Sequence, residues 1–284
     1  ASAAFQLAVW EIVFDAGNRN LSAGSFQATA GSPIATTTMA QGWLNSLNTS
    51  TGWAHWTLYR FSNDKYQDYV SATYGRTCVV IPYGASVIDP GADRLGDVDA
   101  VAGGYHLVVA RFEPENHVLE AVHAYRASTE GRPLLIVGSA PYSQWYVDSV
   151  RAAAGGDARI RFLGSIYDQE LLDQLYANAR TYIHGHSVGG TNPSLLRAMG
   201  AGAPVLGYDV EFNREVTADQ AYFWGDADAL TAIFETIAAG GEEATLARYA
   251  QLGRERIAAV YQWDTVTDQY EALIHRLADS RRRR

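Results

Sequence analysis

The stretch HGHSVGGTNPSLLRAMGAGAPVLGYD, residues 184–209, decides how this chain folds. Its two adjacent glycines, Gly189 and Gly190, let the backbone approach a ligand closely. Thr191 or Asn192 can cap the apolar helix that follows, and the next proline suits the first helical turn. The stretch then ends in the apolar run APVLGYD, so it predicts a loop, a helix and a strand in succession.

The pattern around this stretch is regular from about residue 57 onward. Short apolar runs rich in β-branched residues alternate with longer helical patterns, which predicts a parallel sheet covered by helices, an open Rossmann-like α/β fold. Three further helical patterns between residues 226 and 280 predict a helical C-terminal tail. The runs expected to form strands are 78–84, 105–110, 133–138, 160–164, 181–185 and 203–209.

The first fifty residues have a different composition, dominated by Ala, Ser, Thr and Gly. The segment MAQGWLNSL (39–47) predicts a short amphipathic helix, and the polar segment 48–54 is the best candidate boundary. We therefore expect an atypical lead-in over residues 1–50 and a separate domain over residues 57–284.

Composition excludes several classes of function. The formal net charge of −9 argues against a nucleic-acid partner, because such proteins usually carry a basic face. A single cysteine, Cys78, excludes an internal disulfide, and no apolar run is long enough to span a bilayer. The terminal RRRR (281–284) is either a solvated end or a point of peripheral contact with an anionic membrane.

Two loops predict a site for a phosphate-bearing ligand. Ligands of open α/β sheets bind beyond the carboxyl ends of the strands, where helix N-termini favour anions. Arg111 follows one predicted strand and can make bidentate bonds to a phosphate, and the glycine-rich loop opens a helix after another. Any strand-to-helix turn also needs glycine and a cap, so it is the combination that points to a ligand.

The remaining polar residues leave alternatives open. His184 and His186 could face one way and ligate a metal, but the loop offers no third Cys, Asp or Glu, so we expect no metal site. His186 is then either a ligand contact or an ordinary loop histidine. Glu215 could accept a hydrogen bond from a sugar hydroxyl or cap the segment after it. No catalytic triad or carboxylate pair stands out.

Three segments carry a family resemblance: VVARFEPENHVLEAV (108–122), the long run from Arg159 to Val216, and DADAL (226–230). They resemble the carboxyl-terminal, nucleotide-sugar-binding half of family 4 glycosyltransferases, whose GT-B fold places two Rossmann-like domains across a cleft. The resemblance runs from about residue 57 to the end. The segment HGHSVGGTNPSLL is most similar to a bacterial rhamnosyltransferase subgroup.

The resemblance implies roles for particular residues. Arg111 corresponds to an arginine that holds the donor diphosphate, and Asn116 stands where a lysine is usual. Both acids of the family's glutamate signature are absent: one position falls between Ser187 and Gly189, and the other at Arg197, which could approach a phosphate or pair with an acid elsewhere. The donor-binding residues expected are Arg111, Asn116, His186, Gly189, Gly190, Thr191, Asn192, Ser194, Arg197 and Glu215.

The function implied is retaining glycosyl transfer from a nucleotide-diphospho-sugar, dTDP-rhamnose in that subgroup, to a glycan or lipid-linked acceptor in bacterial surface-polysaccharide synthesis. Such an enzyme works in the cytoplasm at the inner membrane face, without a cofactor besides its donor. It also needs an amino-terminal acceptor domain, so we expect a missing domain or association with another copy. The alternatives are a non-catalytic carbohydrate or surface-interaction protein and another nucleotide-binding enzyme such as an epimerase.

Residues 1–50 show a different resemblance. The segments FQLAVWEIVFD, LSAGSFQ and AQGWLNSL are similar to fragments of thioester-domain-like extracellular proteins, in which a glutamine cross-links to an upstream cysteine. That glutamine would be Gln6. No cysteine precedes it, so no thioester is expected, and the segment is interpreted as a foreign or fragmentary lead-in.

Overall fold

The computed structural model describes residues 79–282 except 141, 142 and 189. These residues belong to one compact unit. The lead-in expected over residues 1–50, the helix expected at 39–47 and the cross-link glutamine Gln6 lie outside the described residues.

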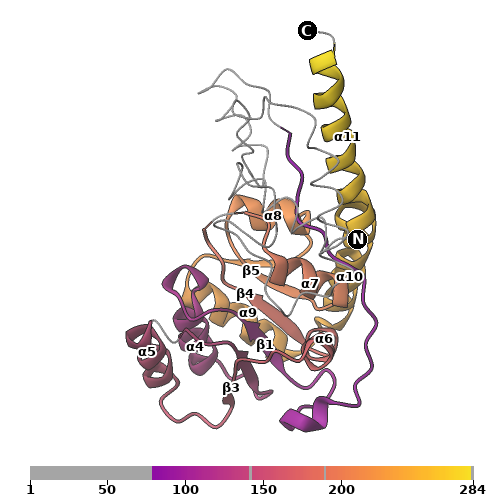
Figure 1. The fold of residues 1–284 in the computed structure, drawn as a ribbon. Helices are drawn as coiled ribbons and strands as arrows, with labels where there is room; N and C mark the ends of the chain where they lie inside the picture. Colours follow the sequence, from indigo (N-terminus) through magenta and orange to yellow (C-terminus); the bar gives the residue numbers. More distant parts are fainter. Residues whose placement is uncertain (1–78, 141–142, 189, 283–284) are drawn as a thin grey trace. The chain divides into compact units, whose positions relative to one another are not determined.

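A six-stranded parallel sheet forms the centre of this unit (Figure 1). Its spatial order is β3-β2-β1-β4-β5-β6, and every neighbouring pair is parallel. This confirms the predicted Rossmann-like fold. The strands are β1 (His106–Val109), β2 (Leu134–Val137), β3 (Ile160–Gly164), β4 (Thr181–His184), β5 (Val205–Tyr208) and β6 (Tyr222–Trp224).

Helices follow the strands as the periodicity predicts, and several cover the sheet on both faces. The α-helices are α4 (Val118–Ala127), α5 (Gln144–Ala154), α6 (Gln169–Ala177), α7 (Pro193–Ala201), α8 (Glu211–Thr217), α9 (Ala227–Ala239), α10 (Glu243–Arg256) and α11 (Trp263–Arg282). Short turns of 3-10 helix, η2 (Leu95–Val98) and η3 (Pro114–Asn116), and one π-helical turn, η4 (Ile257–Tyr261), complete the set.

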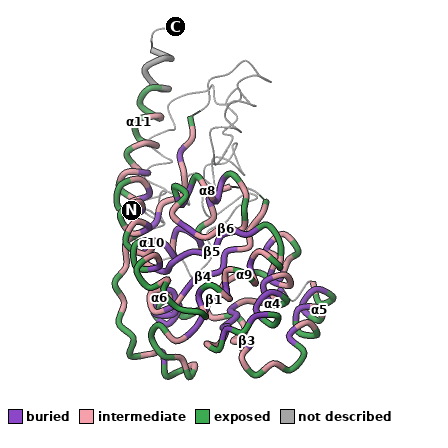
Figure 2. The backbone as a smooth tube through the Cα atoms, turned by 180° about the vertical axis from the view of Figure 1, so that it is seen from behind, coloured by how far each residue is buried: buried purple, intermediate pink, exposed green. Residues whose placement is uncertain are grey.

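The two faces of the sheet carry separate cores. Leu107 packs with α6 and α7, whereas its neighbour Val108 packs with α4, α5 and α9. Successive residues of a strand point to opposite faces, so a strand covered on both sides must be apolar throughout. Leu134, Leu135 and Ile136 of β2 are accordingly all fully buried. Figure 2 shows the strands enclosed by helices.

One predicted strand is absent. Residues 79–84, the described part of the strand expected at 78–84, form no helix and pair with none of the described strands. The chain beyond them is held by helical elements: the Ala85 amide donates to the Tyr261 carbonyl, and the Ile88 amide to that of Gly200. Gly84 lies against the ring of Trp263, where a side chain would clash. Residues 84–88 therefore pack against η4, α7 and α11 rather than within the sheet.

Two elements were not predicted. The strand β6 has three residues and pairs with β5, and α8 follows β5 with seven. Both are shorter than a periodicity argument can detect.

The strand order defines where a ligand can enter. The chain proceeds from β1 through β2 to β3 in one direction across the sheet, and from β4 through β5 to β6 in the other. The direction reverses between β1 and β4. Helices that follow these two strands diverge to opposite faces and leave a crevice at the carboxyl ends.

Candidate functional site

A cleft of about 540 Å³ occupies this crevice. It lies over the carboxyl ends of β1 to β4 and reaches the start of α7. Its lining includes main-chain and side-chain polar groups as well as apolar atoms. The lining residues are Val109, Ala110, Arg111, Asn116, Val137, Gly138, Ser139, Ser165, Ile166, Tyr167, Tyr182, Ile183, His184, Gly185, His186, Asn192, Pro193 and Ser194.

The N-terminus of α7 forms one wall. Asn192 is its cap: the side-chain oxygen accepts hydrogen bonds from the Ser194 amide at 2.9 Å and from the Ser194 hydroxyl at 2.8 Å. Pro193 occupies the first turn, as predicted. Tyr182, whose pKa burial raises to about 12, donates from its hydroxyl to the Ser194 oxygen at 3.0 Å. The helix thus presents an ordered, positively polarised end to the cleft.

Arg111 supplies the cleft's formal charge. It is the only side chain among the described lining residues that carries a formal charge at neutral pH, since the others are apolar, uncharged polar or histidine. Its guanidinium is 66% exposed and lies 3.2 Å from the Glu113 carboxylate. The guanidinium is the exposed partner of this pair, whereas the Glu113 side chain is only 14% exposed. An exposed guanidinium at the end of a flexible side chain can turn toward an anion in the cleft. Arg111 and the N-terminus of α7 thus line the same cleft at the carboxyl ends of the strands.

Hydrogen bonds join the loop after β1 to the loop after β4. The Asn116 amide nitrogen donates to the Arg111 carbonyl at 2.9 Å, and its oxygen lies 2.8 Å from Nδ1 of His186. His117 lies 3.0 Å from the Ser187 hydroxyl, and the Ser187 amide donates to the carbonyl of Glu115. A side chain at Gly185 would overlap the Asn116 carbonyl. These contacts hold the loop after β1 against the loop after β4.

A second histidine, His184, is enclosed beneath the cleft. Its Nδ1 lies 3.3 Å from the Tyr182 hydroxyl, while its buried Nε2 makes no hydrogen bond of good geometry with another described residue. The side chain of Asn213 is close enough to interact with the ring. Burial, assisted by nearby His186, lowers the pKa of His184 to about 3. His184 is therefore neutral at physiological pH and adds polarity without charge.

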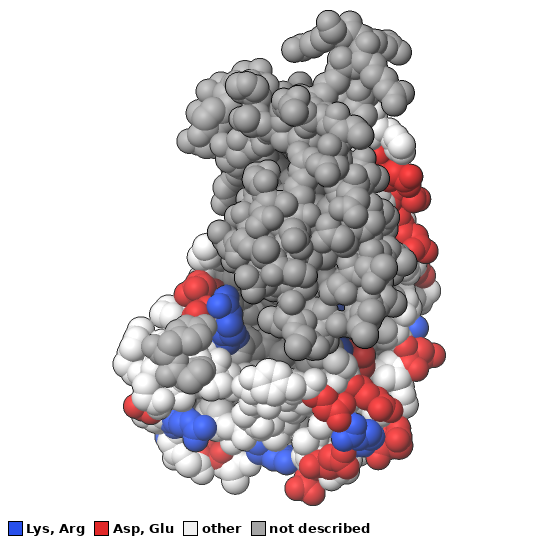
Figure 3. All heavy atoms as spheres, viewed as in Figure 1, with Lys and Arg blue, Asp and Glu red and all other residues white. Residues whose placement is uncertain are grey.

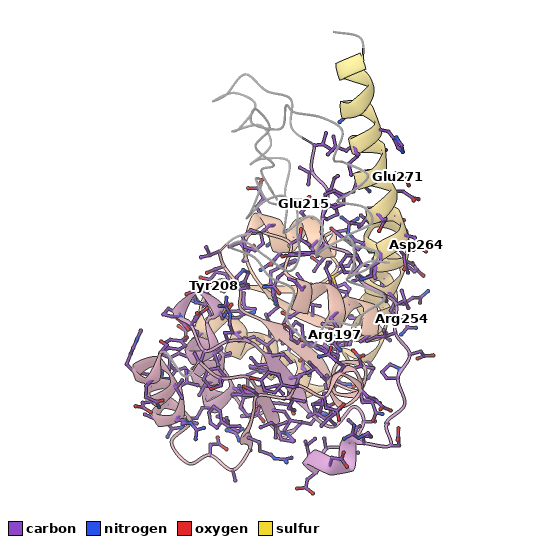
Figure 4. All side chains as sticks on the ribbon, in the orientation of Figure 1. Arg197, Tyr208, Glu215, Arg254, Asp264 and Glu271 are labelled. Atoms are coloured by element: carbon purple, nitrogen blue, oxygen red, sulfur yellow. The ribbon has the colours of Figure 1, made fainter. Side chains whose placement is uncertain are left out.

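Two predicted residues lie elsewhere. Arg197 donates from Nε to Asp173 at 2.6 Å and from its terminal nitrogen to Gln169 at 2.7 Å, both on α6. It pairs with an acid, which is one of its two predicted alternatives, and does not line the cleft. Glu215 lies within α8 and also does not line it (Figure 4). It is not a helix cap.

The remaining predictions concern the loop before α7. Gly190 and Thr191 precede the cap but are not among the lining residues, and Thr191 is buried. Gly189 lies outside the described residues. The cap itself, Asn192 rather than Thr191, was one of the two predicted.

Several lining residues escaped the sequence analysis. Gly138 and Ser139 follow β2, and the segment 165–167 follows β3. Their position at the end of a predicted strand or directly after it could have identified them, as it did for Arg111. Tyr182 carried no such signal, because it lies inside a strand.

The described residues contain no cluster of three or more His, Cys, Asp or Glu side chains that could hold a metal ion. None of the helices within the described range is long and apolar enough to cross a membrane. On the face seen in Figure 3, basic side chains are scattered among acidic and uncharged ones. The cleft itself has a mixed apolar and polar lining with Arg111 as its one charged side chain among the described lining residues.

Comparison with known proteins decides the family. Residues 103–246, half of the chain, match the family model described as "Glycosyl transferases group 1". The chain belongs to this family. The match covers the sheet from before β1 to α10 and includes the whole lining of the cleft.

Individual proteins similar to this chain are consistent with that family. The O-antigen chain mannosyltransferase B of Escherichia coli is 31% identical over 138 residues, which are 45% of this chain and 35% of that protein. Sucrose-phosphate synthase from Thermosynechococcus elongatus has a similar structure, with a TM-score of 0.65 and 21% identity over 78% of this chain and 58% of that one. Anabaena Alr3699/HepE in complex with UDP gives 0.63 and 17% identity, over 76% and 63%.

These structures show that the fold is of the GT-B glycosyltransferase type. The chain spans about a third of the length of the mannosyltransferase it matches and about 60% of the two solved structures.

Proposed function

We propose that the cleft binds the nucleotide-diphospho-sugar donor of a glycosyl transfer. The observation that carries the proposal is the convergence of Arg111 and the capped N-terminus of α7 on one cleft at the switch point of the sheet. A diphosphate is the ligand group best matched to a guanidinium and a helix N-terminus. Five of the solved structures that resemble this chain are titled as complexes containing UDP or UDP-glucose.

The same groups would contribute to the reaction. When the glycosidic bond breaks, negative charge develops on the leaving diphosphate, and fixed donors that already face it stabilise the transition state more than the ground state. Arg111 and the α7 dipole supply that charge complementarity. Asn116, His186, Asn192 and Ser194 supply uncharged hydrogen-bonding groups beside it. No general base for the acceptor is assigned.

The finer assignment follows the sequence resemblance. We propose a retaining transfer, with dTDP-rhamnose as the first donor to test, to a glycan or lipid-linked acceptor of bacterial surface polysaccharide. The likeness to an O-antigen mannosyltransferase supports the polysaccharide role. The transfer would occur in the cytoplasm at the inner membrane face. The domain over residues 57–284 would supply the donor site, and a further domain or a second copy would supply the acceptor site.

Calorimetry with the full chain tests the donor site. dTDP-rhamnose, UDP-glucose and GDP-mannose are each titrated into the wild type, Arg111→Ala and Arg248→Ala. Arg248 is an exposed arginine on α10 that does not line the cleft, so it is a matched control. We expect one donor to bind with millimolar or tighter affinity, and only Arg111→Ala to weaken it, by about tenfold. Absence of heat with all three donors contradicts the proposal.

One observation favours an alternative. Arg197 replaces the acid that the family resemblance places on α7, and its guanidinium is engaged with Asp173 and Gln169 outside the cleft. A non-catalytic carbohydrate or surface-interaction protein on this fold would retain the sheet and lose donor binding. The same titrations separate the two functions, because such a protein gives no heat with any nucleotide-sugar.

A further inference from the structure

The imidazole of His186 is held by one side chain whose own orientation is fixed. Asn116 lies between the Arg111 carbonyl, 2.9 Å from its Nδ2, and His186 Nδ1, 2.8 Å from its Oδ1. A backbone carbonyl only accepts hydrogen bonds, so the group that faces it must be the amide NH₂. The Asn116 oxygen therefore faces His186, and Nδ1 of His186 must carry the proton.

We propose that Asn116 is a positioning residue that holds His186 in its Nδ1–H tautomer, so that the Nε2 lone pair accepts a hydroxyl of the bound sugar. The inference rests on the proposed function and adds the part of the donor that this wall recognises. His186 lines the cleft and is partly exposed, and its Nε2 makes no hydrogen bond with another described residue. In a neutral imidazole with Nδ1 protonated, Nε2 is an acceptor.

The surroundings keep this imidazole neutral. Burial is the main influence that lowers the pKa of His186, and the charges around it partly cancel: Glu115 and Glu113 favour protonation, whereas Arg111 and His117 oppose it. The neutral ring of His184 lies beneath it, and Phe212 of α8 packs edge-on against it. A lone pair repels phosphate oxygens and attracts O–H groups. His186 thus selects for the sugar, whereas Arg111 selects for the diphosphate.

Nitrogen NMR of the full chain with ¹⁵N-labelled histidine tests the tautomer without any ligand. His186→Phe identifies the His186 signals. We expect a protonated Nδ1 and an unprotonated Nε2 in the wild type at pH 7.5. Asn116→Asp places a carboxylate beside Nδ1 and should raise the pKa of His186 by about one unit or more.

Asn178→Asp is the matched control, since Asn178 also donates its amide to main-chain carbonyls but lies away from the cleft, at the end of α6. It should leave the His186 titration unchanged. A proton on Nε2 in the wild type, or equal shifts in both Asp variants, overturns the proposal.

Calorimetry then tests the hydroxyl contact. The probes are UDP-glucose, GDP-mannose and dTDP-rhamnose, each against its own nucleoside diphosphate. Below the raised pKa of His186, Nε2 of Asn116→Asp becomes a donor. The nucleotide-sugar should then lose about 3- to 10-fold more affinity than the diphosphate alone, which reports any effect of the new carboxylate on the diphosphate itself. At pH 8.5 the difference should vanish.

Each result separates the two proposals. Equal losses for nucleotide-sugar and diphosphate contradict the hydroxyl contact but leave the donor site standing. If no probe binds, both the hydroxyl contact and the proposed function are contradicted. The tautomer of His186 is then tested by the NMR result alone.

Discussion

His184 shows how a buried polar residue makes stability depend on pH. Its pKa is lowered by burial from 6.5 to about 3, so the unfolded chain binds a proton in this range and the folded chain does not. The stabilising contribution is complete above 6.5 and is lost as the pH falls toward 3. We expect the free energy of unfolding to drop by about 1.4 kcal/mol per pH unit from this residue.

Denaturant titrations of the full chain at pH 7, 6, 5 and 4 measure this slope. His184→Gln removes the titrating group, so its stability should fall less steeply than that of the wild type below pH 6.5. His275→Gln is the control, because His275 is exposed on α11. Parallel curves for wild type and His184→Gln would mean that the native fold admits the proton.

Single residues were predictable where a local rule applied. Arg111 follows a strand and Asn192 precedes a helix, so each could be placed from its neighbours alone. The hydrogen-bond partners of Arg197 and His186 could not be predicted in this way. Asp173 and Asn116 lie 24 and 70 residues away along the chain, and only the packing of α6 against α7, and of two loops at the switch point, brings them near.

The start of α7 combines helix capping by Asn192 with a proposed contact to the donor diphosphate. One substitution at Asn192 can separate the two. An aspartate at position 192 still caps the helix and interacts favourably with its dipole, but it places a negative charge beside a proposed diphosphate. We expect Asn192→Asp to leave the free energy of unfolding within about 0.5 kcal/mol of the wild type and to weaken donor binding at least tenfold. Asn192→Ala should instead lose about 1 kcal/mol of stability.

Thermal or denaturant unfolding and calorimetry on the same samples check both quantities. Tighter donor binding by Asn192→Asp would show that the helix end does not face the diphosphate.

The close approach of the chain after β2 to the chain after β1 depends on a glycine. Gly138 has φ +137°, and a Cβ there would overlap the Ala110 carbonyl. We expect Gly138→Ala to destabilise the fold by about 3 kcal/mol or more, as measured by denaturant unfolding. Gly131 has open space around its Cα, so Gly131→Ala is the control and should change stability little. Equal effects would contradict the close approach.

Elements were predictable in proportion to their length and regularity. The five strands β1 to β5 and the helices α4 to α7 were found because buried strands are continuously apolar and covering helices repeat every three to four residues. Residues 79–84 have the composition of a strand, but the chain directly after them is held by η4 and α7 instead. Composition reports that a segment is buried and extended, and it does not report which partner buries it.

At the scale of the whole unit, the two ends of the parallel strands have different roles; they are called here the carboxyl edge and the amino edge of the sheet. The carboxyl edge carries the cleft, whereas the amino edge carries a buried polar cluster. There His106 contacts Thr181 at 2.7 Å, and Glu130 accepts from the Arg132 amide at 2.9 Å. Burial acts to raise the pKa of Glu130, but its interactions with His106 and Arg132 outweigh burial and hold the pKa at about 2. This cluster joins the starts of β1 and β4 to the loop before β2.

This separation predicts that the two edges act independently. Glu130→Gln removes a buried charge that accepts hydrogen bonds, so we expect it to lower the free energy of unfolding by about 2 kcal/mol. Donor affinity should stay within about twofold, because the strands between the edges are packed and hydrogen-bonded along their length. Combined with Asn192→Ala, the stability losses should add to within about 0.5 kcal/mol.

Denaturant unfolding of the wild type, both single variants and the double variant forms a complete cycle, and calorimetry on the same proteins gives the affinities. A coupling well above that margin, or a donor affinity that falls with Glu130→Gln, would mean that the sheet transmits changes from its amino edge to the cleft. The cleft geometry would then depend on the whole sheet rather than on the two loops and the helix end that line it.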